Sequence, residues 1–471
     1  RGRTRSTMVP PAIKRVAMEE NLPVLQPSRP SEPEFLDAFR TITPDICVVV
    51  AYGHVLKPEL LAIPPSGFIN VHASLLPKLR GAAPIQHAIL QGLEETGISI
   101  MRLDEGLDCG PVLQRVTTPI EGDETWGDVA FEDRQHVGAW MVPSYDPVLN
   151  LIYIGTSVTS PAPKFMLGGA DLAHLYHNST LALDADTGEI VWYYQHLNDH
   201  WDLDHPFERL LVDTAVAPDP SAVSWINPRL RTGETRRVIT GIPGKTGVVY
   251  TLDRETGEFL WATPTVTQNV ISHIDGATGA VTENSEVVFS GLGQEVLACP
   301  SWIGGKDWEA GAYSPLTNTM YYPLRNTCAR VLSTMEGGLA IYRLAARFQL
   351  APGTEQLGTV RAISAETGQT AWVHEQRTAT MSLVTTGGGL VFGGDVNGRF
   401  RAFDQETGEV LWEINLGSPV TGFPISFAVE GRQYVAVSTG SAATASGFVR
   451  LTPEIRPSAG NNLFVFALPD R

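Results

Sequence analysis

The sequence has few cysteines and no long apolar run. Its four cysteines stand at positions 47, 109, 299 and 328, and no spacing matches the Cys-x-x-Cys pattern of a zinc site. The longest apolar run, Ile46 to Val50, is strand-sized, whereas a membrane helix needs about 20 apolar residues. We therefore expect neither a zinc site nor a membrane span. The chain begins at Arg1 without a charged-then-apolar leader, so no signal peptide is visible.

Net charge and tryptophan are missing from the first part of the chain. Residues 1–120 carry equal numbers of acidic and basic side chains, so the whole net charge of −17 lies after residue 120. All ten tryptophans lie at or after Trp126. This asymmetry indicates two units, which we place at residues 1–124 and 125–471, and the acidic unit is unsuited to nucleic-acid binding. No Gly/Ser-rich or Pro-rich linker separates them.

The first unit alternates helix and strand signals. Residues 31–34, Ser-Glu-Pro-Glu, predict a helix start with Ser31 as its cap. Residues 46–50 predict a strand buried on both faces, and residues 67–72 and 98–101 predict two more strands. A further helix is expected at 84–90, with proline at its start. The alternation predicts an α/β fold with a mainly parallel sheet.

Three polar residues lie at the ends of predicted strands, which is where parallel sheets usually carry their functional residues. Asn70 and His72 alternate along one strand and so share a face, and Asp108 follows a later strand. Taken alone, a single histidine here is more often a satisfied turn residue. An amide or imidazolium donor can, however, stabilise an oxyanion, and a carboxylate can orient the imidazole.

The surrounding sequence resembles methionyl-tRNA formyltransferase, and more broadly the 10-formyltetrahydrofolate transferases. The matching words are INVHASLLPKLRGAAPIQHAILQG and TGISIMRLDEGLDCGPVL, and the resemblance covers about residues 1–124. It implies an α/β formyltransferase-like core fragment in which Asn70, His72 and Asp108 are catalytic. It also implies 10-formyltetrahydrofolate as co-substrate and initiator Met-tRNA as partner. The word SLLP would lie beside the folate and consists of Ser74, Leu75, Leu76 and Pro77.

The resemblance starts partway into that family. Its first strand, with a glycine-containing loop, and its C-terminal tRNA-binding domain have no counterpart here. An absent first strand would leave an unpaired edge on the sheet. We therefore expect impaired transferase activity.

The second unit contains an internal repeat. Four segments share one form, a strand, an acidic turn with Thr-Gly, and a strand ending in tryptophan: LDADTGEIVW, LDRETGEFLW, ISAETGQTAW and FDQETGEVLW. The last two tryptophans, Trp372 and Trp412, are 40 residues apart, the length of one four-stranded propeller blade. The repeat predicts an all-β propeller, and on this pattern alone a binding scaffold and an enzyme are about equally expected.

This unit resembles the pyrroloquinoline quinone (PQQ)-dependent alcohol and methanol dehydrogenases, whose fold is an eight-bladed propeller. The resemblance covers about residues 125–471 and includes YYQHLNDHWDLDH, GIPGKTGVVYTLD and CPSWIGGKDWEAGAYSP. It implies that Trp140 lies under the quinone, that Asp202 is catalytic base and metal ligand, and that Lys245 contacts the quinone oxygens. Two further quinone-binding positions are Asp307 and Trp308. A small alcohol and an electron acceptor would be the partners.

The metal would be Ca²⁺ or a lanthanide. Asp204 occupies the place of a second aspartate found in relatives that use a lanthanide, and a more highly charged ion favours an extra carboxylate. Three departures weaken this interpretation. Val158 replaces a metal-binding Asn, Asp307 replaces a quinone-contacting Asn, and the early blades are missing, so an eight-bladed ring would be incomplete. The alternative is a non-catalytic propeller that serves as a binding scaffold.

The two resemblances also imply different compartments, the cytoplasm for residues 1–124 and the periplasm for residues 125–471. They meet near GDETWGD at residues 122–128. We interpret the chain as a chimeric or truncated product. The quinoprotein relatives place a disulfide at the positions of Cys299 and Cys328, so we expect this bridge. We expect Cys47 and Cys109 to stay reduced, because Cys47 lies in an apolar strand and Cys109 is next to Asp108. Four thiols in a reducing cytoplasm remain the alternative.

Overall fold

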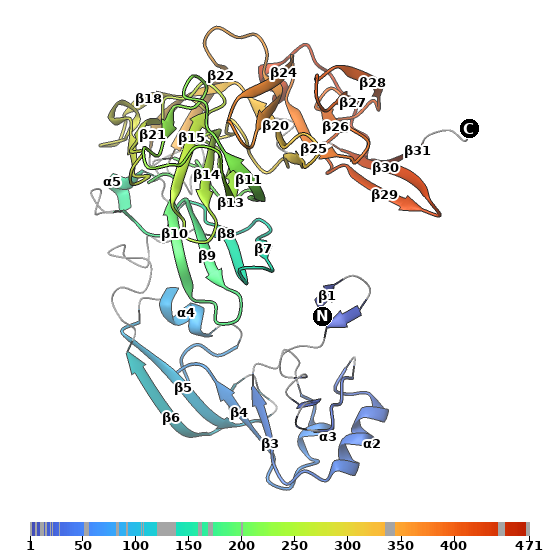
Figure 1. Cartoon of the computed structure of the whole chain (residues 1–471). Coiled ribbons are helices and arrows are strands. Elements are labelled where there is room, and N and C mark those ends of the chain that lie inside the picture. Colours follow the sequence, from blue (N-terminus) through green and yellow to red (C-terminus); the bar gives the residue numbers. More distant parts are fainter. Residues whose placement is uncertain are drawn as a thin grey trace. The chain divides into compact units, whose positions relative to one another are not determined.

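The computed structural model divides the chain into two compact units, residues 1–124 and residues 125–471 (Figure 1). It describes residues 2–4, 7–9, 14, 17–18, 20, 22–27, 29–50, 56–81, 84–90, 93–104, 106, 108–119, 138–158, 163–167, 173–198, 201–334, 344–440 and 448–467. The predicted junction between the two units, residues 122–128, lies outside these described residues. Within them, no helix has the length and apolarity needed to span a membrane.

The first unit is built on one four-stranded sheet with short helices. Its elements are β1 (Gly2–Thr4), β2 (Thr7–Val9), α2 (Pro33–Ile42), β3 (Cys47–Val50), α3 (Pro58–Leu61), β4 (Phe68–His72), α4 (Pro84–Leu90), β5 (Glu95–Arg102) and β6 (Val112–Pro119). The order is β3-β4-β5-β6; β3 and β4 are parallel, but β4–β5 and β5–β6 are antiparallel. The prediction of a mainly parallel sheet is therefore wrong. The connection 103–111 is too short for a parallel crossover, which needs a dozen or more residues.

Two local predictions in this unit also differ from the structure. Glu32, not Ser31, is the N-cap of α2, and no side chain caps the helix; Pro33 fits the first turn because that turn needs no N–H from it. In β3, burial alternates instead of covering both faces, and Val48 and Val50 are exposed. One face of this strand therefore lies open to solvent in the part of the chain that the structure describes.

The second unit is a succession of antiparallel sheets (Figure 1). The first sheets contain β7 (Ser144–Asp146), β8 (Leu151–Gly155), β9 (Ser179–Asp184) and β10 (Ile190–Gln195); then β11 (Leu210–Val216), β12 (Trp225–Ile226), β13 (Glu234–Gly241), β14 (Val248–Asp253) and β15 (Phe259–Pro264); then β16 (Ile271–Ile274) and β17 (Val281–Glu283). The short helical segments α5 (Lys164–Leu167) and η2 (Ser285–Val287) lie in this part of the chain, and residues 448–451 form another helical turn.

The later sheets follow the same plan. They contain β18 (Glu295–Ala298), β21 (Thr327–Ser333) and β22 (Leu344–Leu350); β19 (Ala312–Ser314), β20 (Thr319–Arg325), β23 (Gly358–Ser364) and β24 (Thr370–Gln376); β25 (Thr380–Thr385), β26 (Leu390–Asp395), β27 (Arg399–Asp404) and β28 (Val410–Asn415); and β29 (Ile425–Val429), β30 (Arg432–Thr439) and β31 (Asn462–Ala467). The predicted all-β, propeller-like arrangement is thus observed.

The repeated words form hairpin turns between the last two strands of a sheet. In the turn after β27, Asp404 Oδ1 accepts the N–H groups of Glu406 and Thr407 at 2.9 and 2.8 Å. Gly408 then takes a left-handed φ of 73°, which glycine adopts without steric cost. In the repeat that ends at Trp372, Ser364 replaces the aspartate, and its Oγ accepts the N–H of Thr367 at 3.1 Å.

The tryptophan of one repeat packs on the glycine of the next. A Cβ atom placed on Gly257 would lie 2.8 Å from the ring of Trp192, and one placed on Gly408 would lie 2.5 Å from the ring of Trp372. Because glycine has no side chain, the indole ring can pack directly against the backbone of the turn. The first repeat is different, because Gly188 has no atom within 4 Å of its Cβ position.

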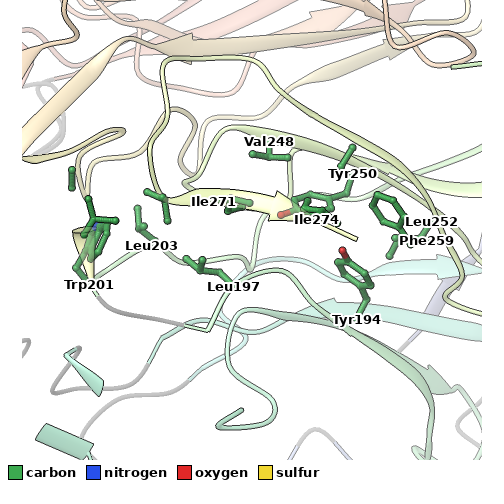
Figure 2. Packing of buried hydrophobic residues seen from close by; sticks show 14 of the residues in the cluster. Tyr194, Leu197, Trp201, Leu203, Val248, Tyr250, Leu252, Phe259, Ile271 and Ile274 are labelled. Atoms are coloured by element: carbon green, nitrogen blue, oxygen red, sulfur yellow. The ribbon is translucent and has the colours of Figure 1, made fainter. Parts of the chain in front are cut away.

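A large hydrophobic core packed against the first sheets holds the segment 201–204, which contains Asp202 and Asp204. Figure 2 shows Tyr194, Tyr250 and Phe259 packed in this core, together with Trp201 and Leu203. Trp201 and Leu203 are completely buried. Because these two side chains enter the core, the backbone that carries Asp202 and Asp204 between and beside them is held in place.

Candidate functional sites

The structure brings together the three polar residues predicted in the first unit. Asn70 and His72 lie on β4, and Asp108 lies in the connection from β5 to β6. Asn70 Nδ2 donates to Asp108 Oδ1 at 3.2 Å, and His72 Nδ1 lies 3.6 Å from Asp108 Oδ2. Asp108 Oδ2 also accepts the N–H of Gly81 at 2.9 Å. One carboxylate therefore orients an amide, an imidazole and a loop.

The geometry of His72 fixes where one of its protons lies. Its Nε2 is 2.8 Å from the carbonyl oxygen of Leu79. Because a carbonyl oxygen only accepts, Nε2 carries a proton and donates it. The other ring nitrogen, Nδ1, then faces Asp108 within a mostly buried site. This arrangement suits a histidine whose second nitrogen exchanges a proton next to a carboxylate.

The SLLP loop is held by a residue that the sequence reasoning missed. Ser99, buried on β5, donates through Oγ to the carbonyl oxygen of Ser74 at 2.6 Å and accepts the N–H of Leu76 at 3.0 Å. Ser74 Oγ in turn donates to Lys78 O at 2.7 Å. No motif marked Ser99, since its only signal was a small polar residue in an apolar strand. The loop at 74–77 is thereby bonded to the sheet that carries His72.

In the second unit, Asp202, Asp204 and Lys245 form one buried cluster. Lys245 Nζ donates to Asp202 Oδ1 at 2.8 Å and lies 3.2 Å from Asp204 Oδ2. The other oxygen of Asp204, Oδ1, accepts the N–H of Val158 at 3.2 Å. Lys245 is also tied through its backbone, because its N–H donates to Asp204 O at 2.8 Å. Two segments that lie about forty residues apart in the sequence thus meet at the ammonium group of Lys245.

Burial and charge both act on this cluster. Burial raises the pKa of Asp202 to about 6; the ammonium of Lys245 opposes this rise, and the carboxylate of Asp204 adds to it. Burial alone would lower the pKa of Lys245, but Asp202, Asp204 and Asp307 hold it well above its usual range. The ammonium therefore stays charged at neutral pH, whereas Asp202 changes protonation near pH 6.

Asp307 connects this cluster to a second set of buried charges that the sequence reasoning missed. Its Oδ2 lies 4.0 Å from Arg325 NH1, and Arg325 also forms an ion pair with Glu309. Both Arg325 and Glu309 are essentially inaccessible to solvent, and burial raises the pKa of Glu309. The available signal was a charged residue at the end of the wholly buried strand β20.

The two predicted aromatic positions each make a ring contact outside this cluster. Trp140 is 47% exposed and meets Phe207 edge-on, with ring centres 5.7 Å apart. Trp308 meets Phe423 at 5.6 Å. The accessible indole of Trp140 leaves ring surface on which a flat ligand could stack.

The donor set is chemically suited to a hard cation, although it is small. Two carboxylates converge on one point, and Val158 contributes only a backbone N–H, which cannot ligate a metal. Next to Val158, Ser157 Oγ and the side-chain amide of Asn178 are buried without a hydrogen-bond partner. In the described part of the chain, no three His, Cys, Asp or Glu side chains gather as a metal-binding group. Two carboxylates are fewer than the roughly six to eight oxygen ligands that Ca²⁺ takes, and Lys245 Nζ lies between them, so the described residues supply only part of a cation site.

A disulfide joins the two cysteines of the second unit. Cys299 and Cys328 are bonded, while Cys47 and Cys109 take no part in a disulfide. The bridge lies at the base of the loop that leads to Asp307, and in this loop Gly305 N–H donates to Lys245 O at 2.8 Å. The bridge therefore anchors a loop that contacts the lysine of the site.

Comparison with known proteins assigns the two units to two families. Residues 1–143 match the formyl transferase family, and residues 116–272 and 354–435, just over half of the chain, match the family described as glucose/ethanol/alcohol dehydrogenase, beta-propeller domain. The chain belongs to this dehydrogenase propeller family, and it carries an N-terminal formyltransferase domain. The two matched regions overlap between residues 116 and 143.

Individual relatives agree with this assignment. The methionyl-tRNA formyltransferase of Thermus thermophilus is 55% identical over 115 residues, which cover 24% of this chain and 38% of that protein. That of Halorhodospira halophila is 45% identical over 157 residues, which cover 33% of this chain and 49% of that protein. The chain thus spans less than half the length of these formyltransferases.

Two solved structures resemble the second unit. A europium-containing methanol dehydrogenase has a TM-score of 0.64 and 25% identity, covering 79% of this chain and 70% of its own. A quinohemoprotein alcohol dehydrogenase from Pseudomonas putida has a TM-score of 0.62 and 26% identity, covering 80% of this chain and 57% of its own. Both parts of the chain therefore derive from enzyme families.

Proposed function

We propose that residues 125–471 are an incomplete eight-bladed quinoprotein that oxidises a small alcohol with PQQ, and that residues 1–124 are the core of a methionyl-tRNA formyltransferase. The observation that carries the first proposal is the buried cluster of Asp202, Asp204 and Lys245. Its residue types are those that alcohol oxidation requires, namely a base, a cation-binding carboxylate and a fixed positive charge.

In this proposal each side chain has one task. Asp202 accepts the hydroxyl proton of the alcohol, which its pKa of about 6 allows at neutral pH because most of the carboxyl is then ionised. Lys245 holds Asp202 Oδ1 and presents a positive charge. Asp202 and Asp204 would hold Ca²⁺ or a lanthanide, and Trp140 and Trp308 would flank the cofactor with Asp307. When bound, PQQ supplies the hydride acceptor and the cation supplies Lewis-acid polarisation.

The incomplete ring supports reduced activity. Gly188, in the first repeat, meets no neighbouring tryptophan, whereas Gly257 and Gly408 each do. This difference is what loss of a preceding blade would leave behind. Val158, with no ligating side chain, adds to the argument for the alternative, a propeller that serves as a binding scaffold. An electron acceptor is a further partner that the enzyme, but not the scaffold, requires.

Titration with PQQ in the presence of Ca²⁺ or La³⁺ separates the enzyme from the scaffold. Quenching of tryptophan fluorescence should saturate near one PQQ per chain. In Trp140→Ala the affinity for PQQ should fall at least about tenfold, because stacking area is lost. Trp412→Ala, at a tryptophan outside the cluster, is the matched control and should leave the affinity unchanged. Absence of saturable quenching with either cation would favour the scaffold.

For the first unit, we propose formyl transfer from 10-formyltetrahydrofolate to initiator Met-tRNA through Asn70, His72 and Asp108. The observation that carries this proposal is the convergence of Asn70 and His72 on the carboxylate of Asp108. Asn70 and His72 would stabilise the oxyanion, and Asp108 would orient the imidazole and assist proton movement. Ser74, Leu75, Leu76 and Pro77 would lie beside the folate. Because the tRNA-binding domain has no counterpart, transfer should be slow.

We also propose that the fusion is a chimeric product joined near residue 125. The charge asymmetry, the absence of tryptophan before Trp126 and the overlap of the two family matches all fall in this region. The first unit suits the cytoplasm, whereas the second, with its disulfide, suits the periplasm. Long-read sequencing of source DNA across codons 115–135 tests this, and a single read with both parts in frame, with a matching transcript, would exclude an artificial junction.

A further inference from the structure

We propose that Lys306 is a positioning residue for Trp140, and that it acts through the ring of Phe207. The inference rests on the proposed dehydrogenase function, which places Trp140 beside PQQ, and it adds a residue to which no role has been given so far. Because Lys306 is completely inaccessible to solvent, it acts through its neighbours and not by touching the cofactor.

The ammonium group of Lys306 is held by three partners. Its Nζ donates to Glu208 Oε2 at 2.7 Å and to the carbonyl oxygen of Asp307 at 3.0 Å. It also lies over the ring of Phe207, 4.9 Å from the ring centre. A lysine ammonium has three N–H donors, and an aromatic face attracts a cation, so these partners account for all three donors. The position of the ammonium over the ring is therefore fixed by protein groups.

Glu208 joins the segment that carries Phe207 to the loop that carries Lys306. Its second carboxylate oxygen, Oε1, accepts the N–H of Gly311 at 2.7 Å, while Oε2 binds the ammonium. The backbone N–H of Phe207 donates to Pro243 O at 3.0 Å. Two consecutive residues thus meet Lys306, one through its carboxylate and the other through its ring.

The plane of the Phe207 ring determines the plane of the Trp140 indole. The two rings meet edge to face, with centres 5.7 Å apart and planes at 83°, which is a favourable aromatic geometry. Phe207 is buried, whereas Trp140 is 47% exposed and has fewer neighbours to hold it. The terminal torsion of a phenylalanine side chain is broad, so packing must fix the ring plane. The ammonium over the ring supplies such a contact, and its loss should let both rings tilt.

Near-ultraviolet circular dichroism of Trp140 tests this coupling without PQQ. The signal is the difference between a chain that contains Trp140 and the same chain with Trp140→Phe. Lys306→Met should reduce this difference by about half or more, because the indole loses its fixed environment. Gly408→Ala, which destabilises the same unit at another place, is the control and should leave the difference unchanged. An undiminished Trp140 signal in Lys306→Met would overturn the proposal.

A double variant keeps the proposal testable if Lys306→Met folds poorly. Removing one partner of a buried ion pair leaves the other charge uncompensated, and Lys306→Met combined with Glu208→Gln avoids this. The double variant also lacks the ammonium over Phe207, so it should show the same reduced Trp140 signal. A folded double variant with the full signal would likewise contradict the proposal.

PQQ titration gives a second measurement. Lys306→Met should weaken PQQ binding by roughly three- to tenfold, the order expected for one aromatic contact. In a Trp140→Ala background the same substitution should cost no further affinity, because its effect passes through Trp140. Additive losses would overturn the proposal. An unaltered chain that binds no PQQ would remove the proposed dehydrogenase function, whereas the circular dichroism would still decide the coupling of Lys306 to Trp140.

Discussion

The indole ring of Trp372 lies directly against Gly408, and its Nε1 donates to the carbonyl oxygen of Gln405 at 2.9 Å. One side chain thus joins β24 of one sheet to the turn after β27 of the next. Trp192 makes the corresponding contact with Gly257 and donates to Arg254 O at 3.3 Å. The repeat in the sequence therefore encodes the connection between successive sheets.

Replacing Gly408 by alanine should destabilise the second unit by about 1–3 kcal/mol, since it adds a clash with Trp372 to the strain of a positive φ. Gly188→Ala is the matched control, because this glycine has the same turn and a φ of 78° but no neighbour at its Cβ position. Urea unfolding followed by tryptophan fluorescence reports on this unit alone, as every tryptophan lies at or after Trp126. Equal losses in the two variants would show that the indole contact contributes nothing.

The raised pKa of Asp202 predicts that the second unit loses stability as pH rises. The unfolded carboxyl titrates near 3.8 and the folded one near 6, so the folded state holds the extra proton between these values. The contribution is therefore absent below about pH 4 and reaches a cost of about 3 kcal/mol above pH 6. In Asp202→Asn this pH-dependent cost should disappear.

The measurement is the free energy of unfolding at several pH values between 4 and 7.5, in EDTA. Asp219→Asn serves as a control of opposite sign, because backbone and side-chain hydrogen bonds from Ser221 lower the pKa of this exposed carboxyl. Its stabilising contribution is present above the unfolded pKa and is lost as pH falls. A parallel pH dependence in the unaltered chain and in Asp202→Asn would refute the assignment.

Thiol counting tests the pairing of the cysteines. The denatured, unreduced protein should react with a thiol reagent at two positions, Cys47 and Cys109, and at four after reduction. Replacing both Cys299 and Cys328 by serine should cost about 3.6 kcal/mol, the chain-entropy estimate for a loop of this size. Four reactive thiols before reduction in protein from an oxidising compartment would contradict the pairing.

His72→Ala, placed in a hybrid with the missing formyltransferase parts restored, should lower the formyl transfer rate by a hundredfold or more, on the order expected for loss of one oxyanion donor. His87→Ala is the control, since this histidine is exposed on α4. Steady-state transfer to Met-tRNA is the readout. Similar rates for the two variants would show that His72 has no direct part.

The sequence predicted the fold best where local signals and chain order agreed. The turns with Thr-Gly and the strands beside them were recognisable because their aspartate or serine and their glycine act locally. A fifth turn of this kind, from Asp275 to Gly279, was missed because no tryptophan follows it; Asp275 nevertheless accepts the N–H of Thr278 at 2.8 Å. Strand direction in the first unit was wrong because β-branched runs do not encode parallel or antiparallel pairing.

The candidate site was predictable only in part. The sequence motifs around Asp202 and Lys245 identified these residues as candidates, and the family resemblance predicted that they share one site. Their direct contact, and the ion pair between Arg325 and Glu309, depend on packing between segments far apart in the sequence, which no spacing reveals. Ser99 was invisible for the same reason, because its partners are backbone atoms of a loop 23 to 25 residues away.

The central claim, that the cluster around Asp202 oxidises alcohols, is tested most directly by a single-turnover measurement. The chain is loaded with PQQ and Ca²⁺ or La³⁺, mixed with a series of small primary alcohols, and the absorbance of the bound cofactor is followed. We expect alcohol-dependent reduction that Asp202→Asn slows by about a hundredfold or more, because the base is lost. Bound cofactor that stays oxidised with every alcohol, or an equal rate in Asp202→Asn, would contradict it.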